Sequence, residues 1–357
     1  METYTKAESN DDFSGDYEIP TGFPQIPEGY SPCKYDLTNR FNQWFFPVTF
    51  LLVFALGLVG NGLVLYVLKS RRFPWHLADH YLFQLTISDL LLGLTLPFWA
   101  TQYAYGWVFG QTPCKMLGAL FSINMYSSIF FLACIGLNRY FSIVHAVELH
   151  KKQKPIHTFL ICVFVWVTSF LLSVQEFYFR DVDYVKQMGT FVCHYKFQPE
   201  NAAVWRITLR FVNLSLGFLV PMFLMLFFYC RIFCTLRRSR HGHSYRSQTV
   251  IVVLLLVFLI CWGPYNVLLL IDSLQRIGLI APDCALYRQL DLGLAITESL
   301  GLSHVCLNPL VYAFVGVKFR SELYLLSTRR SRQARPSASS KEDTVITENN
   351  NSYSRVF

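Results

Sequence analysis

Seven long apolar runs, separated by short polar connections, constrain this chain more than any other feature of its sequence. Each run has enough residues for a helix that crosses a hydrocarbon core of about 30 Å. Only 15% of the residues are charged, whereas about 25% is usual in a soluble domain. We therefore expect an all-α membrane protein, a seven-transmembrane helix bundle. Its spans are predicted at residues 46–68, 77–103, 115–142, 156–177, 204–235, 247–273 and 288–315.

The distribution of basic residues predicts how the bundle is oriented. The net charge is +8, but the bases gather in connections on one side of the runs, as at Lys69, Arg71, Lys151, Arg237 and Lys318. By the positive-inside rule this side faces the cytosol, which places the N-terminus outside and the C-terminus inside. The charge therefore does not indicate a nucleic-acid partner. Residues 1–45 contain no apolar signal-peptide core, so the first span is expected to act as a signal anchor.

Three segments are predicted outside the bundle, which we place at residues 44–315. Residues 1–43 are acidic and proline-punctuated, which favours a disordered extracellular segment. In it, Tyr17 lies between Asp16 and Glu18, a setting in which secreted tyrosines are often sulfated. The segment is either a solvated tail or an anionic surface that attracts a basic protein. Residues 316–328 predict a short amphipathic eighth helix, and residues 329–357 a disordered Ser/Thr-rich cytoplasmic tail whose phosphorylation would create a docking strip.

A carboxylate, Asp89, lies in the middle of the second predicted span. A charge at this depth is costly unless it has a partner, so Asp89 is expected to face the bundle interior. Two interpretations are open: a structural polar network, or a cation site, for sodium. The residues expected around Asp89 are Asn61, Asn124, Ser128, His304 and Asn308.

The ten cysteines divide into two groups by position. Six lie within predicted spans and are interpreted as ordinary buried thiols. The other four lie on the predicted outer side, where an even number indicates two disulfides. They are Cys33, Cys114, Cys193 and Cys284, and their three pairings remain open from the residues alone. No C-x-x-C metal spacing occurs in the chain.

Two patterns predict departures from regular transmembrane helices. Side chains of residues 190–195 alternate as in a strand around Cys193, which predicts a β-hairpin in the second extracellular loop. Prolines within the spans remove backbone hydrogen bonds and favour kinks or hinges. These prolines are Pro97, Pro221, Pro264 and Pro309.

Several motifs, taken together, resemble those of class A (rhodopsin-like) G-protein-coupled receptors. They cover all seven spans: Gly60-Asn61, Leu85 to Asp89, Cys114, Arg139-Tyr140, Trp166, Pro221, Cys261-Trp262-x-Pro264 and Asn308-Pro309-x-x-Tyr312. Thr95-Leu96-Pro97, the four outer cysteines and the stretch from His304 to Pro309 narrow the resemblance to chemokine receptors. Within these, segments 107–110 and 118–121 look most like the CXC receptor for interferon-inducible chemokines.

The resemblance implies the disulfides Cys114–Cys193 and Cys33–Cys284, and a two-part contact with a basic CXC chemokine. The acidic N-terminus, with Tyr17, would hold the chemokine body. The chemokine's own N-terminus would enter a pocket whose carboxylates suit a cationic end. The pocket residues implied are Trp99, Phe121, Glu176, Tyr265, Asp272, Asp291 and Glu298. For Glu176 or Asp291 alone, a solvated charge at the rim is the alternative.

The resemblance also implies a set of activation switches, and one of them departs from the family pattern. The switches are Asn138, Arg139, Tyr140, Tyr229, Trp262, Pro264, Pro309 and Tyr312. The family usually has Asp where this chain has Asn138. Asn can accept a hydrogen bond from Arg139 but cannot supply the ion pair that restrains it in the resting state.

Two functions are therefore open. The first is a plasma-membrane receptor that signals through Gi-class G proteins in leukocyte chemotaxis, with receptor kinases and arrestin as further cytoplasmic partners. The second is an atypical scavenger that internalises chemokine without G-protein signalling. The residues leave open whether the protein forms a homodimer or heterodimer.

Other classes lack the features they need. The sequence has no nucleophile elbow, H-E-x-x-H or P-loop, so an enzyme is not expected. A channel or transporter would show an internal repeat or a continuous charged path. A retinal photoreceptor would need a lysine in the last run, and an amine receptor a carboxylate in place of Phe121. No cofactor is expected besides the sodium ion considered at Asp89.

Overall fold

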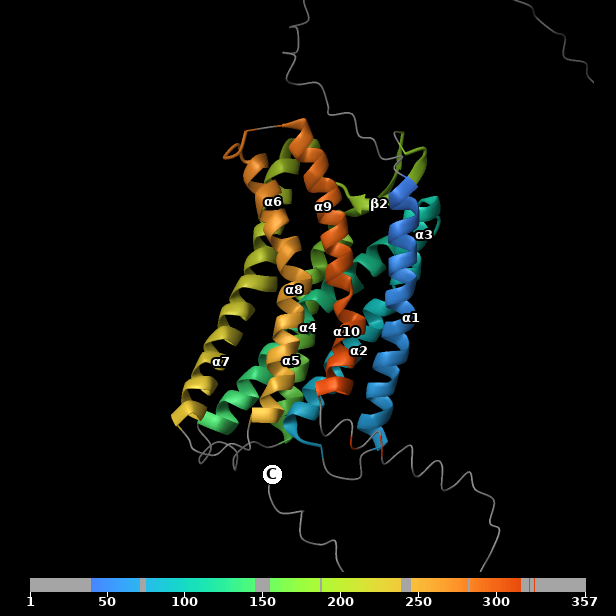
Figure 1. The fold of residues 1–357 in the computed structure, drawn as a ribbon. Helices are drawn as coiled ribbons and strands as arrows, with labels where there is room; N and C mark the ends of the chain where they lie inside the picture. The colour runs from blue at the N-terminus through green and yellow to red at the C-terminus, as the bar shows by residue number, and fades with distance from the viewer. Residues whose placement is uncertain are drawn as a thin grey trace, which may run out of the picture. The chain divides into compact units, whose positions relative to one another are not determined.

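The computed structural model describes residues 40–70, 75–144, 155–186, 188–238, 245–281, 283–315, 321 and 324. Within these ranges, seven helical spans are long and apolar enough to cross a membrane, and they pack side by side in a bundle (Figure 1). The predicted seven-helix fold is confirmed. The helices are α1 (Arg40–Ser70), α2 (Leu77–Gly93), α3 (Leu96–Tyr105), α4 (Gln111–Val144), α5 (Pro155–Phe179), α6 (Ala202–Leu214), α7 (Val220–Arg238), α8 (Tyr245–Arg276), α9 (Cys284–Leu302) and α10 (His304–Val315).

Some predictions fall outside the described residues. These are the acidic segment before Arg40, with Tyr17 and Cys33, and the Ser/Thr-rich tail at 329–357. Of the predicted eighth helix, only Ser321 and Tyr324 are described, and both are helical.

The second and fifth of the seven spans are each divided between two helices: α2 and α3 form the second span, and α6 and α7 belong to the fifth. In both, the regular α-helix is interrupted about four residues before a proline. Pro97 cannot donate to the carbonyl of Gly93, and α2 ends at Gly93 before α3 begins at Leu96. Pro221 cannot donate to Gly217, which lies in the π-helical segment η3 (Ser215–Leu219) between α6 and α7. The break predicted near Pro97 is therefore present. Pro264, by contrast, lies inside α8, which continues as a helix on both sides of it.

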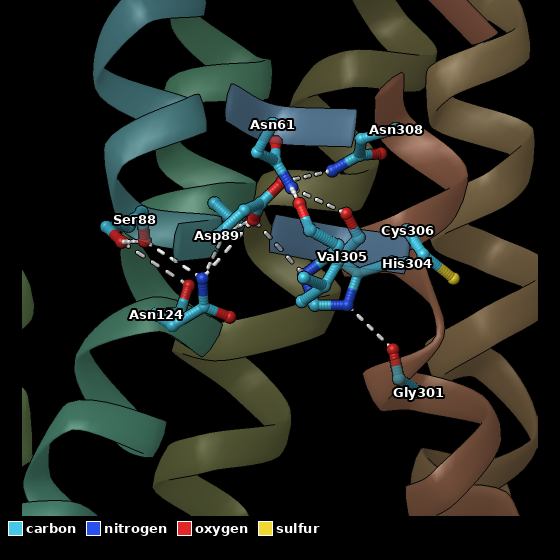
Figure 2. A network of polar contacts seen from close by, with 12 residues as sticks. Asn61, Ser88, Asp89, Asn124, Gly301, His304, Val305, Cys306 and Asn308 are labelled. Atoms are coloured by element: carbon cyan, nitrogen blue, oxygen red, sulfur yellow. Dashed lines mark hydrogen bonds and ion pairs between the residues drawn. The ribbon is translucent and has the colours of Figure 1, made fainter. Parts of the chain in front are cut away.

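The last span is broken at Ser303, between α9 and α10, and not at Pro309 itself. Pro309 lacks the N–H that would bond to the carbonyl of Val305. That carbonyl accepts a hydrogen bond of 2.8 Å from Nδ2 of Asn61 on α1 (Figure 2). A side chain from the first span thus replaces the backbone bond that the proline removes from the last.

The distribution of side chains on α5 shows which face points outward. Phe159, Phe164 and Leu171 are exposed, whereas Ser169 and Ser173 are fully buried. Small polar residues inside and large apolar residues outside are typical of a helix whose outer face meets lipid. The chain is accordingly a multi-pass membrane protein.

A two-stranded antiparallel hairpin lies between α5 and α6, as the alternation of residues 190–195 predicted. Its strands are β1 (Arg180–Val185) and β2 (Thr190–Tyr195), with Val182 opposite Cys193. A short 3-10 turn (Pro199–Asn201) then leads into α6. Near the first turn of α4, Cys114 forms a disulfide with Cys193 and ties the hairpin to the bundle.

The remaining cysteines only partly follow the prediction. Cys284 is disulfide-bonded, and its predicted partner, Cys33, lies outside the described residues. The six cysteines within spans are free. Cys230 and Cys234, however, are exposed, so the expectation that both are buried was wrong. They lie on the outward face of α7, where the surrounding lipid accommodates a small apolar thiol as well as a protein core does.

Replacing Cys114 with serine should destabilise the protein. The disulfide closes a loop between residues 79 positions apart in sequence, and losing such a bond costs about 2–5 kcal/mol. The thermal unfolding midpoint of the purified protein should therefore fall. Cys134→Ser, which alters a free, half-buried cysteine of the same helix, is the matched control. Equal shifts in the two variants would show that the disulfide contributes nothing beyond ordinary packing.

Candidate functional site

A cavity of about 320 Å³ lies between the helices at the hairpin end of the bundle. Its wall combines residues of α4, α5, α6, α8 and α9 with residues of the hairpin. Four of the seven predicted pocket residues line it, namely Phe121, Glu176, Tyr265 and Glu298. The other three, Trp99, Asp272 and Asp291, lie outside its wall.

Trp262 of α8 connects this cavity to the interior of the bundle. Its ring is almost fully buried and meets Phe121 edge-on at 6.3 Å and Tyr265 at 5.8 Å between ring centroids. On its other side, the ring lies 5.8 Å from that of His304. Trp262 therefore contacts both the cavity wall and the buried polar core.

Glu176 already has a partner within the chain. Its Oε2 lies 2.5 Å from Nε of Arg180, and its Oε1 accepts a hydrogen bond from the hydroxyl of Tyr195. The guanidinium also lies over the rings of Trp99 and Tyr195, at 5.2 and 4.9 Å from their centroids. Since Glu176 is only 3% exposed, it is a buried, paired carboxylate and not a solvated rim charge.

The guanidinium of Arg180 fits because α4 has no side chain at Gly118. A Cβ at Gly118 would collide with Nε and Cδ of Arg180 and lie 2.9 Å from its Cζ. The Nη1 atom is also 3.9 Å from Sγ of Cys193, next to the disulfide. The disulfide and the Glu176–Arg180 pair thus hold the hairpin against the same part of α4.

Asp272 is likewise paired within the protein. It accepts a hydrogen bond from Nη1 of Arg210, and its Oδ2 lies 2.8 Å from Nε of Arg276. Arg210 lines the cavity, whereas Asp272 is not part of its wall. Two of the four predicted acidic residues are thus already neutralised by the chain's own arginines.

The cavity wall is consequently mixed in charge and not simply acidic. Arg180, Arg206 and Arg210 line it together with Glu176 and Glu298. Arg206 lies over the ring of Phe197, at 5.6 Å from the centroid. Among the described residues, Glu298 makes no ion pair. Sequence reasoning missed these arginines, although the spacing of four between Arg206 and Arg210 at the start of an apolar run indicates one shared helical face.

Asp89 lies at the centre of a polar cluster drawn from three spans (Figure 2). Its Oδ2 accepts a hydrogen bond of 2.8 Å from Nδ2 of Asn308. Its Oδ1 accepts from Nδ2 of Asn124 at 3.3 Å and from the hydroxyl of Ser128 at 3.4 Å, and lies 3.6 Å from Nε2 of His304. The structure thus brings together four of the five residues expected around Asp89.

Asn61, the fifth, lies nearby but bonds elsewhere. Its Nδ2 donates to the carbonyls of Gly57 and Val305 and makes no hydrogen bond to Asp89. Sequence reasoning missed Ser88, whose hydroxyl accepts from Nδ2 of Asn124 at 2.9 Å. Ser88 directly precedes Asp89, and adjacent helical residues do not share a face, so nothing in the sequence indicated its involvement.

Several predicted switch residues lie near the end of α4 that is farther from the hairpin, and they have unsatisfied polar groups. Within the described part of the chain, Nε of Arg139 and the hydroxyls of Tyr229 and Tyr312 are buried without a hydrogen-bond partner. No described hydrogen bond or ion pair joins Asn138 to Arg139. The ring of Tyr140 packs 5.5 Å from that of Phe228. Unsatisfied buried groups are costly, so a rearrangement or partner that satisfies them would be favoured.

The chain is similar to known proteins over most of its length. Residues 60–312 match the family described as "7 transmembrane receptor (rhodopsin family)". Identity to the C-X-C chemokine receptor type 3 of Bos taurus is 39% over 329 residues, covering 90% of this chain and 89% of the relative. The type 3 receptor of Homo sapiens gives 39%, with 90% and 88% covered. The C-X-C chemokine receptor type 1 of Pongo pygmaeus is 42% identical over 311 residues, with 87% of each chain covered.

Neutralising Glu176 should destabilise the fold. In Glu176→Gln the guanidinium of Arg180 stays buried without its counter-charge, and breaking such a pair costs about 3–5 kcal/mol. The thermal unfolding midpoint of the purified protein should fall by several degrees. The control is Asp183→Asn, which removes an exposed partner of Lys196 on the same hairpin and should change little, because water and salt screen surface pairs. Similar shifts in both variants would contradict this account of Arg180.

Proposed function

The chain belongs to the chemokine receptors of the rhodopsin family, and from that premise we propose that it binds a basic CXC-type chemokine and signals through Gi-class G proteins. It is not an enzyme. In this proposal the N-terminus and hairpin face outward at the plasma membrane, and the connections rich in Lys and Arg face the cytosol. The observation that carries the proposal is the contact of Trp262 with both the cavity wall and the polar core.

Glu298 is the residue in the cavity best suited to receive the N-terminal ammonium group of a chemokine. Glu176 is bound by Arg180, and Asp272 by Arg210 and Arg276. Glu298 lines the cavity and makes no ion pair among the described residues. A cationic ligand end would therefore gain most by approaching Glu298, because attraction between opposite charges is strong where water is excluded.

A ligand in this cavity would act on the rest of the bundle through packed side chains. Phe121 lines the cavity and meets Trp262, which in turn meets His304 beside Asp89. A ligand that binds one arrangement of these side chains more tightly than another shifts the equilibrium between them. Receptor kinases and arrestin would then act on the cytoplasmic tail, where added phosphates create a docking strip.

Glu298→Gln should impair activation more than binding. Losing one charge-assisted contact at the ligand's N-terminus should raise the chemokine concentration for half-maximal Gi activation about tenfold. The Kd should change less, since most of the chemokine surface binds elsewhere. Both are measured on cells with matched surface expression, using a panel of CXC chemokines. Glu200→Gln, at an exposed position outside the cavity wall, is the control. Equal losses of binding and signalling would argue against a specific role for Glu298.

One observation favours the scavenger alternative, namely that Arg139 lacks the acidic partner usual in the family. The residue before it is Asn138, and Arg139 makes no ion pair in the part of the chain that is described. We favour a coupled receptor because Arg139 itself is present to engage a G protein. Its weaker restraint should then raise basal activity.

Asn138→Asp should lower basal Gi signalling. The carboxylate can form a charge-assisted hydrogen bond with Arg139, a contact that Asn138 does not make among the described residues, and this stabilises the resting state by about 1 kcal/mol. This corresponds to about a fivefold change in the active population. Basal cAMP inhibition and chemokine uptake are measured side by side, with Asn138→Ala as the uncharged control. A wild-type protein that takes up chemokine without any Gi response, together with an Asn138→Asp variant that gains one, would establish the scavenger instead.

A further inference from the structure

His304 is oriented by a hydrogen bond that fixes the roles of its two nitrogens. The side chain is buried, and its Nδ1 lies 2.7 Å from the carbonyl oxygen of Gly301 (Figure 2). A carbonyl oxygen can only accept, so Nδ1 carries the proton of this bond. In the neutral imidazole, Nε2 is then an acceptor. This Nε2 has no hydrogen-bond partner among the described residues and faces Oδ1 of Asp89 at 3.6 Å.

Without a hydrogen between them, Nε2 of His304 and Oδ1 of Asp89 are both hydrogen-bond acceptors, and such a contact is energetically unfavourable. A lone pair on Nε2 and a carboxylate oxygen repel, and the repulsion is strong because the surroundings are dry. One proton held between the imidazole and the carboxyl group converts the repulsion into an attractive contact, whichever group carries it. A bound cation between the two groups would have the same effect, so the geometry requires one or the other.

The atoms around Asp89 do not fit a sodium ion. Hard cations take oxygen ligands. Asn124 and Asn308, however, both turn their Nδ2 donors toward the carboxylate, and Oδ1 of Asn124 is buried elsewhere without a partner. His304 presents a nitrogen on a third side. Among the described residues that hydrogen-bond to the carboxylate, Ser128 alone offers a neutral oxygen, and its hydroxyl donates to Oδ1. N–H groups repel a cation, whereas they stabilise a carboxylate directly.

We propose that His304 takes the place of a sodium ion in this polar core, so that Asp89 finds its counter-group within the chain. The sequence left open a structural polar network or a sodium site at Asp89. This proposal is the structural network, in which the imidazole of His304 is the partner of the carboxylate. The consequence is that sodium does not stabilise this protein. His304 also contacts Trp262, so a movement of that ring acts on the Asp89 contact directly, with no ion to expel.

The test compares the thermal unfolding of the purified full-length protein in sodium chloride and in choline chloride at equal ionic strength. Wild type should unfold at the same temperature in both salts. His304→Asn replaces the imidazole with a side chain that can turn an oxygen toward Asp89. Its midpoint should be higher in sodium chloride by about 2–4 °C, the size of shift expected when an ion binds the folded state with sodium well above its Kd. His304→Ser, a second oxygen-bearing variant, should behave likewise.

Two controls make the result specific. The double variant His304→Asn/Asp89→Asn removes the carboxylate and should lose the sodium shift. His194→Asn, which changes a histidine on the hairpin, should behave as wild type. A wild-type protein that is stabilised by sodium would overturn the proposal. So would folded His304→Asn and His304→Ser variants that both remain indifferent to it, because the histidine would then not be what excludes the ion.

Discussion

A helix in hydrocarbon has no water to satisfy its backbone, so every hydrogen bond that a proline removes must be replaced from within the protein. In this bundle the replacement at Pro309 comes from Asn61, which donates to the carbonyl of Val305. The bond requires α1 and α10 to lie very close together, and Gly60 permits this, since a Cβ there would lie 2.9 Å from Cβ of Pro309. The first and last spans are thereby joined beside the polar core, where Asn308 reaches Asp89.

The charged groups at the hairpin end of the bundle are under the same constraint, that polar groups away from water need partners within the protein. Buried charges are tolerated only when they are paired, and here Glu176 and Asp272 are paired by arginines of the chain itself. The cavity therefore combines saturated charges, which hold its walls together, with Glu298, which makes no described ion pair. A pocket of this kind selects a ligand by where its charge lies and not by its total charge.

How far the sequence predicted this structure depended on how local each signal was. The spans follow from apolar length and the strand Thr190–Tyr195 from alternation, and both were predicted closely. Asp89 and most of its neighbours were found because a carboxylate in mid-membrane needs partners. Asn308 was among the neighbours expected, although 219 positions separate it from Asp89, but only the fold shows that its Nδ2 donates to the carboxylate.

The pocket was predicted less well, for reasons that are also physical. Glu176 and Arg180 are four positions apart, so their pairing could have been read from helical spacing. Arg210 and Asp272 are 62 positions apart and belong to different spans. Without that pairing Asp272 looks like a free acid, and the pocket looks more negative than it is. Cys230 and Cys234 were misplaced because an apolar helix does not reveal which of its faces meets lipid.

The close contact between Gly118 and Arg180 restricts which substitutions this chain can accept during evolution. Arg180 fills the volume that any larger residue at this position would need. A substitution of Gly118 alone would push the guanidinium of Arg180 away from Glu176 and leave both charges without a partner. A side chain at position 118 therefore requires the side chain at position 180 to move or to become smaller, and the carboxylate at position 176 would then lose its partner. Substitutions at positions 118, 176 and 180 should therefore be correlated among descendants of this protein.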